Sequence, residues 1–167
     1  MMNNALANPT TAIMTLAQAI AWRNTLRHAG KRLVITNGCF DILHRGHAQY
    51  LYESRCFGDA QLVLINTDAS VRALKGASRP IVDEYNRAYM LTALAAVDAV
   101  VMFDAQICAD ELRALTPDIY VKGGDYSVEK LNPDERAALL ECGVEFHFIP
   151  FVEGFSTTSI ITKIKQN

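Results

Sequence analysis

The sequence predicts an α/β fold, a single domain built on a parallel five-stranded sheet with helices on both faces. Short apolar runs rich in β-branched residues, typical of strands buried on both faces, alternate along the chain with segments of helical period near 3.6. Strands separated by helices pair in parallel through right-handed crossovers. Polar, glycine-containing loops follow the strands, at the edge where such Rossmann-like sheets bind ligands.

The elements follow in order along the chain. Residues 1–12 mix Asn, Pro and Thr, so we expect a loose tail ahead of a domain over residues 13–167. A leading helix is predicted over residues 15–28, because its apolar residues follow a helical period and Gly30 lies at a C-cap position. Strands are predicted at residues 33–35, 62–65, 99–103, 119–121 and 144–149. Further helices are predicted from about residue 45 and at residues 70–74, 84–96, 108–115, 133–142 and 156–165.

Composition limits the classes of function. The chain has 167 residues, half of them hydrophobic, which is enough for one domain with a sizeable core. A net charge of −2 gives no basic field, so we expect neither nucleic acid nor a membrane as partner. The four cysteines lack CxxC pairing, which disfavours a zinc site and a disulfide framework. No signal-peptide pattern or membrane-spanning run is present, which predicts a cytoplasmic protein.

The stretch at residues 36–47, TNGCFDILHRGH, directly follows the first predicted strand. Gly38 would let the chain turn and bring backbone close to a ligand. The next helix should start near Arg45, which places His44 and His47 at its first turn. Unpaired backbone N–H groups and the helix dipole make that turn a suitable phosphate site. A cap or a surface position is the alternative for a single histidine, and no third ligand at metal spacing supports a metal site.

These residues resemble a known family. Asn37-Gly38-Cys39-Phe40-Asp41, followed by His44-Arg45-Gly46-His47, resembles the signature of the cytidylyltransferase-like nucleotidyltransferases, distant relatives of class I aminoacyl-tRNA synthetases. With LKG at 74–76, VKGGDY at 121–126 and EGFSTTSI at 153–160, the chain is most similar to the D-glycero-D-manno-heptose 1-phosphate adenylyltransferases. The resemblance implies transfer of AMP from ATP to a sugar 1-phosphate, with release of pyrophosphate.

The resemblance also implies roles for particular residues. His44 and His47 would hold the triphosphate, and Lys75 would bridge it to the acceptor phosphate; these three are the expected catalytic residues. The expected nucleotide-binding residues are Asn37, Gly38, Cys39, Phe40, Gly46, Lys122, Gly124, Asp125, Ser156, Thr157 and Thr158. The expected acceptor-phosphate residues are Asp41, Asn66, Arg79 and Arg87. Mg2+ would be carried by the triphosphate, without a protein metal site.

Plainer interpretations of several residues stay open. Lys75 fits an ordinary surface lysine, and Gly-Gly-Asp describes many simple turns. Ser156 and its neighbours can cap the last helix. Arg87 lies at helical spacing and fits a solvated helix face equally well. Cys39 also suits a redox protein, and the whole chain suits a nucleotide-binding module without turnover.

Two departures from the family pattern concern substrate choice. Asn86 stands where relatives often have an acidic residue before the position of Arg87, which puts the acceptor pocket in question. Glycerol 3-phosphate cytidylyltransferases carry an arginine two to three residues before the glycine of the STT motif, whereas Phe151-Val152-Glu153 precede Gly154 here. This difference points away from the cytidylyl branch. Glycerol 3-phosphate with CTP, or another small phosphate acceptor, remains the alternative.

The resemblance implies partners as well. Related enzymes often pair through this fold, so a homo-oligomer, a dimer or a tetramer, is expected. Fused heptose enzymes also carry a sugar-kinase domain that this chain lacks, so a separate sugar kinase would supply the acceptor.

Overall fold

The computed structural model describes residues 8–150 and 154–166. Within these residues, one parallel sheet of six strands has the order β1-β4-β3-β2-β5-β6. The strands are β1 (Ile13–Met14), β2 (Leu33–Gly38), β3 (Ala60–Asn66), β4 (Ala99–Phe103), β5 (Ile119–Gly123) and β6 (Glu145–Ile149). The α-helices are α1 (Leu16–His28), α2 (Arg45–Arg55), α3 (Asp68–Lys75), α4 (Glu84–Thr92), α5 (Ala109–Leu115), α6 (Pro133–Cys142) and α7 (Thr157–Gln166). Short 3-10 helices lie at Pro9–Ala12 and Val128–Lys130.

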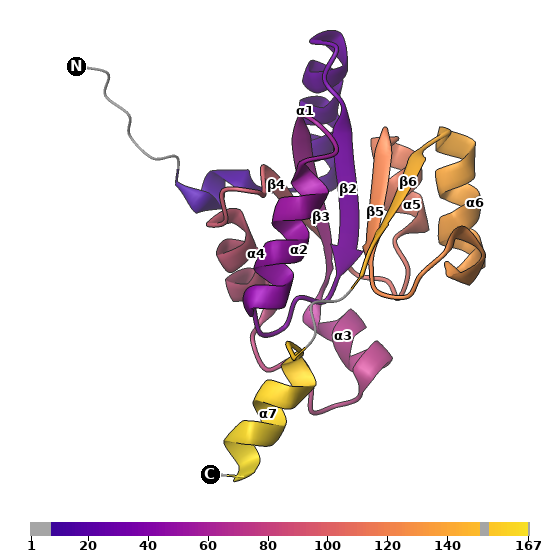
Figure 1. The fold of residues 1–167 in the computed structure, drawn as a ribbon. Helices are drawn as coiled ribbons and strands as arrows, with labels where there is room; N and C mark the ends of the chain where they lie inside the picture. The colour runs from indigo at the N-terminus through magenta and orange to yellow at the C-terminus, as the bar shows by residue number, and fades with distance from the viewer. Residues whose placement is uncertain (1–7, 151–153, 167) are drawn as a thin grey trace.

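Helices cover both faces of the sheet, which confirms the predicted Rossmann-like α/β class (Figure 1). Side chains alternate along each strand. Leu62 and Leu64 therefore join the cluster that packs under α1, α5 and α6. Val63 and Ile65 belong to the second cluster, under α2 and α4. The buried strands thus supply one apolar layer to each face.

The predicted strand count is wrong by one. β1 has only two residues, too few to show a strand pattern in the sequence. It forms because Ile13 and Met14 pair in parallel with Val100 and Val101 of β4. Residues 9–12, assigned above to a loose tail, form a 3-10 helix capped by Asn8, whereas residues 1–7 lie outside the described part of the chain.

Several boundaries also differ from the prediction. β2 continues to Gly38, because residues 36–38 pair with residues 63–65 of β3. α4 ends at Thr92 and not at residue 96, because tight turns at Leu94 and Val97 return Val97 to the core. α1 begins as predicted, and Thr15 and Gln18 form a capping box at its start.

The order of the strands reverses between β2 and β5. These two strands pair only at Val34–Ile119 and Ile35–Tyr120, although both continue further. Their carboxyl ends therefore diverge, and open parallel sheets bind ligands at such a point. α7 lies beyond the carboxyl ends of the strands, near α3, and not on a face of the sheet (Figure 1).

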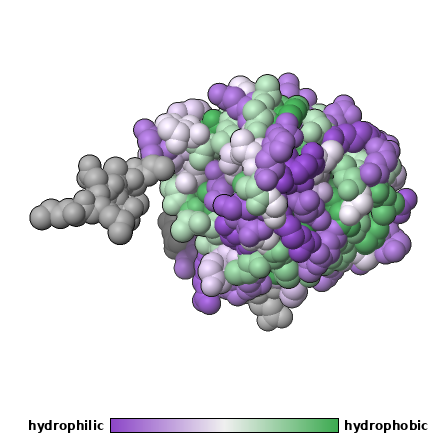
Figure 2. Space-filling view, turned by 90° about the horizontal axis from the view of Figure 1, so that it is seen from above, coloured by the Kyte–Doolittle hydropathy of each residue, from purple (hydrophilic) through white to green (hydrophobic). Residues whose placement is uncertain are grey.

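One face of the molecule is mixed in character. On the face seen in Figure 2, hydrophilic and hydrophobic residues are interspersed. No helix within residues 8–150 and 154–166 is both long and apolar enough to cross a membrane.

Candidate active site

A cavity of about 920 Å³ lies at the carboxyl ends of the strands. Its lining comes from loops that are far apart in the sequence. The predicted site residues that line it are Asn37, Gly38, Cys39, Phe40, Asp41, His44, Gly46, His47, Asn66, Lys75, Lys122, Ser156, Thr157 and Thr158. A space of this size suits a nucleotide together with a small second substrate.

The turn between β2 and α2 is shaped by Phe40. Its backbone has φ 47°, in the left-handed region that non-glycine residues seldom adopt. Its ring is buried and contacts the ring of His47, with centroids 5.2 Å apart. A Cβ on Gly38 would lie 3.0 Å from the Phe40 ring. Gly38 therefore ends a strand and makes room for Phe40, whereas the turn itself comes two residues later.

His44 is the N-cap residue of α2. Its Nδ1 accepts a hydrogen bond from the backbone N–H of His47, at 3.4 Å. A neutral ring that accepts at Nδ1 carries its proton on Nε2. The rings of His44 and His47 stack, with centroids 3.8 Å apart and planes 19° apart. The start of α2 thus carries two imidazoles, as predicted, and one of them is also the helix cap.

Burial keeps both rings uncharged near neutral pH. Desolvation lowers the pKa of His44 below its ordinary value of 6.5. Desolvation also lowers the pKa of His47, to about 4, and the nearby charges of His44 and Lys75 add to this effect. Neutral imidazoles still donate through N–H, so the pair can bind phosphate oxygens without a permanent charge.

Arg87 is buried away from the cavity, with an exposed fraction of 1%. Its guanidinium donates to the carbonyl of Val82 at 2.9 Å, of Cys39 at 2.6 Å and of Asn66 at 2.8 Å. It also forms an ion pair with Asp68 at 2.8 Å. The solvated helix face considered for Arg87 is therefore wrong. Its bonds join the loops after β2 and β3, and no cavity surface is left for the predicted contact with the acceptor phosphate.

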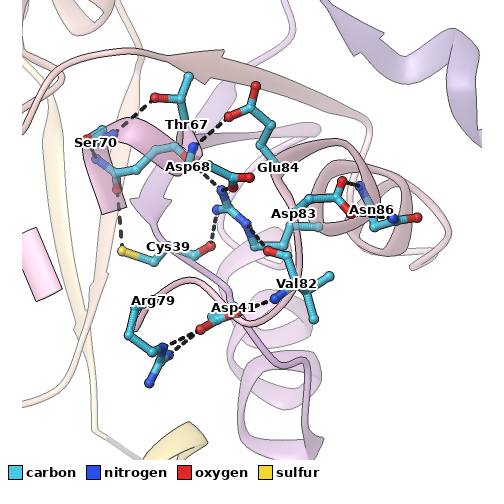
Figure 3. Close-up of polar contacts among 12 residues, drawn as sticks. Cys39, Asp41, Thr67, Asp68, Ser70, Arg79, Val82, Asp83, Glu84 and Asn86 are labelled. Atoms are coloured by element: carbon cyan, nitrogen blue, oxygen red, sulfur yellow. Dashed lines mark hydrogen bonds and ion pairs between the residues drawn. The ribbon is translucent and has the colours of Figure 1, made fainter. Parts of the chain in front are cut away.

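Asp41 also directs its side chain into the protein. One carboxylate oxygen pairs with Arg79 at 2.5 Å, and the other accepts from the backbone N–H groups of Ile81 and Val82 at 2.8 and 2.9 Å. Figure 3 shows this carboxylate between Arg79 and Val82. Asp41 and Arg79 thus fasten the segment after α3 to the β2–α2 turn. Both were predicted at the acceptor phosphate, but Arg79 does not line the cavity and the oxygens of Asp41 are already bonded.

The remaining predicted residues divide into two groups. Lys75, the last residue of α3, and Lys122 in β5 line the cavity. Ser156 also lines it, and its hydroxyl accepts from the backbone N–H of Ser159, so Ser156 caps α7 as well. Gly124 is buried at φ 107° and donates to a carbonyl of β6, and Asp125 is exposed. Neither Gly124 nor Asp125 lines the cavity.

The geometry agrees with comparisons to known proteins. Residues 35–163 match a family model described as Cytidylyltransferase-like. The chain belongs to the cytidylyltransferase-like family. As a member, it is a nucleotidyltransferase.

Individual relatives agree with this assignment. The chain is 46% identical over 158 residues to a protein called Bifunctional protein HldE in Methylococcus capsulatus, covering 95% of this chain and 33% of that one. It is 46% identical over 142 residues to a protein of the same name in Helicobacter pylori strain Shi470, covering 85% and 29%. The chain therefore spans about a third of the length of these relatives.

Solved structures share the fold. A lipopolysaccharide core biosynthesis protein from Thermoplasma volcanium is 28% identical, with a TM-score of 0.59, over 74% of this chain and 98% of that one. A pantoate-beta-alanine ligase from Francisella tularensis is 12% identical, with a TM-score of 0.55, over 92% and 76%. The second likeness concerns the fold alone.

The cavity of this cytidylyltransferase-like protein suits a polyanion. The amino ends of α2 and α7, two imidazoles and the cations of Lys75 and Lys122 all border it. Both carboxylate oxygens of Asp41 in its lining accept from protein donors, as do Oε1 of Glu135 and Oε1 of Glu53. Within residues 8–150 and 154–166, no group of three or more His, Cys, Asp or Glu side chains is placed to hold a metal ion.

Sequence reasoning missed several residues of the lining. Tyr50 fills the crevice between β2 and β5, where its hydroxyl bonds Thr36 Oγ1 at 2.6 Å and the carbonyl of Val121 at 3.0 Å. Gln106 enters from the loop after β4 and Glu135 from α6. No motif marks them, and only the position of that loop after a strand could have indicated Gln106.

Proposed function

We propose that this nucleotidyltransferase transfers AMP from ATP to D-glycero-D-manno-heptose 1-phosphate, giving an ADP-sugar and pyrophosphate. The observation that carries the proposal is the convergence of four sequence motifs on one cavity, since the same motifs carry the resemblance to the heptose branch. The names of the relatives support it, because one solved relative is a lipopolysaccharide core biosynthesis protein.

The chemistry needs alignment and charge neutralisation. An oxygen of the sugar phosphate attacks the α-phosphorus of ATP, the bond from that phosphorus to the bridging oxygen breaks, and pyrophosphate leaves. The nucleophile is already an anion, so neither a covalent enzyme intermediate nor a strong general base is required. Placing two polyanions in line and neutralising the charge that develops on the leaving oxygens supplies the acceleration.

Each part of the cavity has a place in this scheme. The N–H donors of His44 and His47 would bind triphosphate oxygens and donate most strongly as charge develops on the bridging oxygen. Lys75, at the end of α3, would contact the two substrates' phosphates together. The amino end of α7, with the hydroxyls of Thr157 and Thr158, would take the β- and γ-phosphates.

Mg2+ is part of the proposal as a component of the substrate. Bound to the triphosphate, it would neutralise charge on the phosphoryl oxygens. The described residues fit this arrangement, because the carboxylates of Asp41, Glu53 and Glu135 in the cavity lining all accept hydrogen bonds from protein donors. The imidazoles, lysines and helix ends of the lining suit phosphate.

The substrates define the reactions around this one. Because the acceptor is a sugar 1-phosphate, a kinase that phosphorylates the anomeric oxygen must act before it. We place both steps in the cytoplasm, where ATP is available, and we expect the enzyme to work as a homo-oligomer.

Pyrophosphate release tests the proposal. The enzyme is incubated with ATP or CTP and Mg2+ against heptose 1-phosphate, glycerol 3-phosphate and phosphopantetheine. We expect turnover with ATP and heptose 1-phosphate alone. Turnover with CTP and glycerol 3-phosphate would replace this assignment by the cytidylyl alternative, and absence of turnover across the panel would contradict both.

A further inference from the structure

A chain of hydrogen-bonded polar groups crosses the cavity floor where β2 and β5 diverge. We call it the floor network, and its centre is the side-chain amide of Asn37. Asn37 Oδ1 accepts from Lys122 Nζ at 2.6 Å and from the hydroxyl of Tyr120 at 2.7 Å. Asn37 Nδ2 donates to Glu135 Oε1 at 3.1 Å and to Cys108 Sγ at 3.1 Å. The network therefore connects a cation in the cavity to an anion on α6.

The hydrogen bonds of Glu135 are unusual for a glutamate at its position on the helix. It is the third residue of α6, where a glutamate commonly accepts from the backbone N–H of the N-cap residue, here Asn132. Its carboxylate instead accepts from the backbone N–H and the thiol of Cys108, at 3.1 and 3.2 Å, and from Asn37. Only 6% of Glu135 is exposed. A carboxylate is costly to bury, so these donors are what stabilise it there.

Glu135 determines which way the Asn37 amide points. An ionised carboxylate only accepts hydrogen bonds and an ammonium only donates them, whereas an amide does both at different ends. With Glu135 on one side and Lys122 on the other, a single orientation of Asn37 satisfies both neighbours. That orientation directs Oδ1 at Lys122 and holds the ammonium at the cavity surface.

Charge also couples the two ends of the network. Burial lowers the pKa of Lys122, and the negative charge of Glu135 opposes this effect most strongly among its neighbours. The titratable groups that face Lys122 are Glu135 from α6, Cys108 before α5, Cys39 after β2, Tyr120 of β5 and Tyr126 after β5. Glu135 thus favours the ammonium form in a position where burial disfavours it.

We propose that Glu135 is a positioning residue of the nucleotide site, which acts through Asn37 to hold the Lys122 ammonium against a bound nucleoside triphosphate. The proposal rests on the proposed function, because it takes the nucleotide as the ligand that Lys122 meets. Lys122 has three N–H donors, of which Asn37 uses one, so donors remain for the ligand.

Binding of ATP, measured by calorimetry between pH 6.5 and 9.5, tests the proposal with Glu135→Gln. Loss of an outer partner that orients a metal ligand commonly weakens metal binding about 10- to 100-fold, and for the comparable support of Lys122 we expect the dissociation constant to rise about tenfold. The KM for ATP should rise with little change in kcat. The alkaline loss of ATP affinity should begin at a lower pH than in the wild type, because Lys122 loses its stabilising charge. Asp134→Asn, an exposed neighbour on the same turn, is the matched control and should bind as the wild type does.

A second variant separates positioning from simple structural support. If Glu135 acts through Lys122, then Glu135→Gln should have no further effect on ATP affinity in a Lys122→Gln background. An undiminished effect in that background, or an unchanged affinity and pH profile in the single variant, would overturn the proposal. If the glutamine variant does not fold, Glu135→Asp, which keeps the charge, takes its place in these measurements. A wild-type protein that binds neither ATP nor CTP would contradict the proposed function itself, whereas normal wild-type binding with an unaffected variant would contradict this inference alone.

Discussion

The imidazoles of His44 and His47 stack 3.8 Å apart at the amino end of α2, and the backbone N–H of His47 donates to Nδ1 of His44. Protonation of either ring would bring a positive charge close to its neighbour and to the positive end of the helix dipole. The geometry therefore favours two neutral rings in the free protein. A polyanion bound next to the pair would favour a charged ring.

The pH dependence of stability should reflect this pair. The pKa of His47 falls from 6.5 to about 4 on folding, so between these values the unfolded chain binds a proton that the folded chain does not. The free energy of unfolding should therefore rise with pH from about 4 to 6.5 and should fall on acidification. His47→Asn should flatten this slope in thermal unfolding at a series of pH values. His28→Asn, at the exposed end of α1, is the control and should keep the wild-type slope.

Turnover should depend strongly on the same side chain. Because one preorganised donor to a developing negative charge is worth roughly 10²–10³ in rate, His47→Ala should lower kcat by about that factor. The dissociation constant for ATP should change far less. The measurement is pyrophosphate release beside direct nucleotide binding. Equal losses in binding and turnover would argue for a general binding role, and an unchanged kcat would exclude His47 from catalysis.

Arg87 should matter for stability more than any exposed cation. Arg87→Met would leave three loop carbonyls without their donor and Asp68 without its partner, and losses at such sites amount to about 3 kcal/mol. Arg113 forms ion pairs with Glu141 and Asp110 at the surface and is the matched control. Urea unfolding should show a large loss in the free energy of unfolding for Arg87→Met and a much smaller loss for Arg113→Met. Similar losses in the free energy of unfolding for the two variants would show that the buried bonds of Arg87 contribute no more to stability than the exposed ion pairs of Arg113.

The contrast between Lys75 and Arg87 shows how far the sequence could predict the site. Hydrophobic runs place the strands, and parallel strands present their following loops at one edge, so Lys75 and the histidines were correctly predicted to share a crevice. Arg87 has the same charge and a helical spacing. Its orientation depends on carbonyls of Cys39 and Asn66, which come close only after the strands pair. Spacing along the chain carries no information about such partners.

Glu135 was missed for a related reason. An acidic residue in the first turn of a helix is ordinary, since it favours the helix dipole wherever it lies. What distinguishes Glu135 is its contact with Cys108 and Asn37, which lie 27 and 98 residues away along the chain. Likewise, β1 is too short to give a pattern of its own and is defined by its pairing with β4.

Gly46 should be intolerant of substitution despite its place in a helix. A Cβ there would lie 3.0 Å from the ring of His44 and 3.2 Å from Cβ of Phe155, closer than side chains normally approach. Gly46→Ala should therefore displace the His44 ring and the segment leading into α7, and a shift of about 1 Å at such groups can lower the rate about 10²-fold. Alanine is a better helix former than glycine, so the unfolding temperature should fall little. Loss of the fold in this variant would contradict this account, and so would wild-type turnover.

Cys39 should be a site of inactivation by alkylation. It is half-buried and lines the cavity, with Sγ 3.7 Å from Oδ1 of Asn66. A group added to this sulfur would occupy the space proposed for the nucleotide, so iodoacetamide should abolish turnover and bound ATP should protect. Cys56 is exposed and would also meet the reagent, so the experiment uses a Cys56→Ser background. Cys39→Ala in that background should keep its activity and resist the reagent. A Cys39→Ala variant without turnover would show that the thiol itself takes part in the chemistry, as a redox role would require, and would refute the steric account.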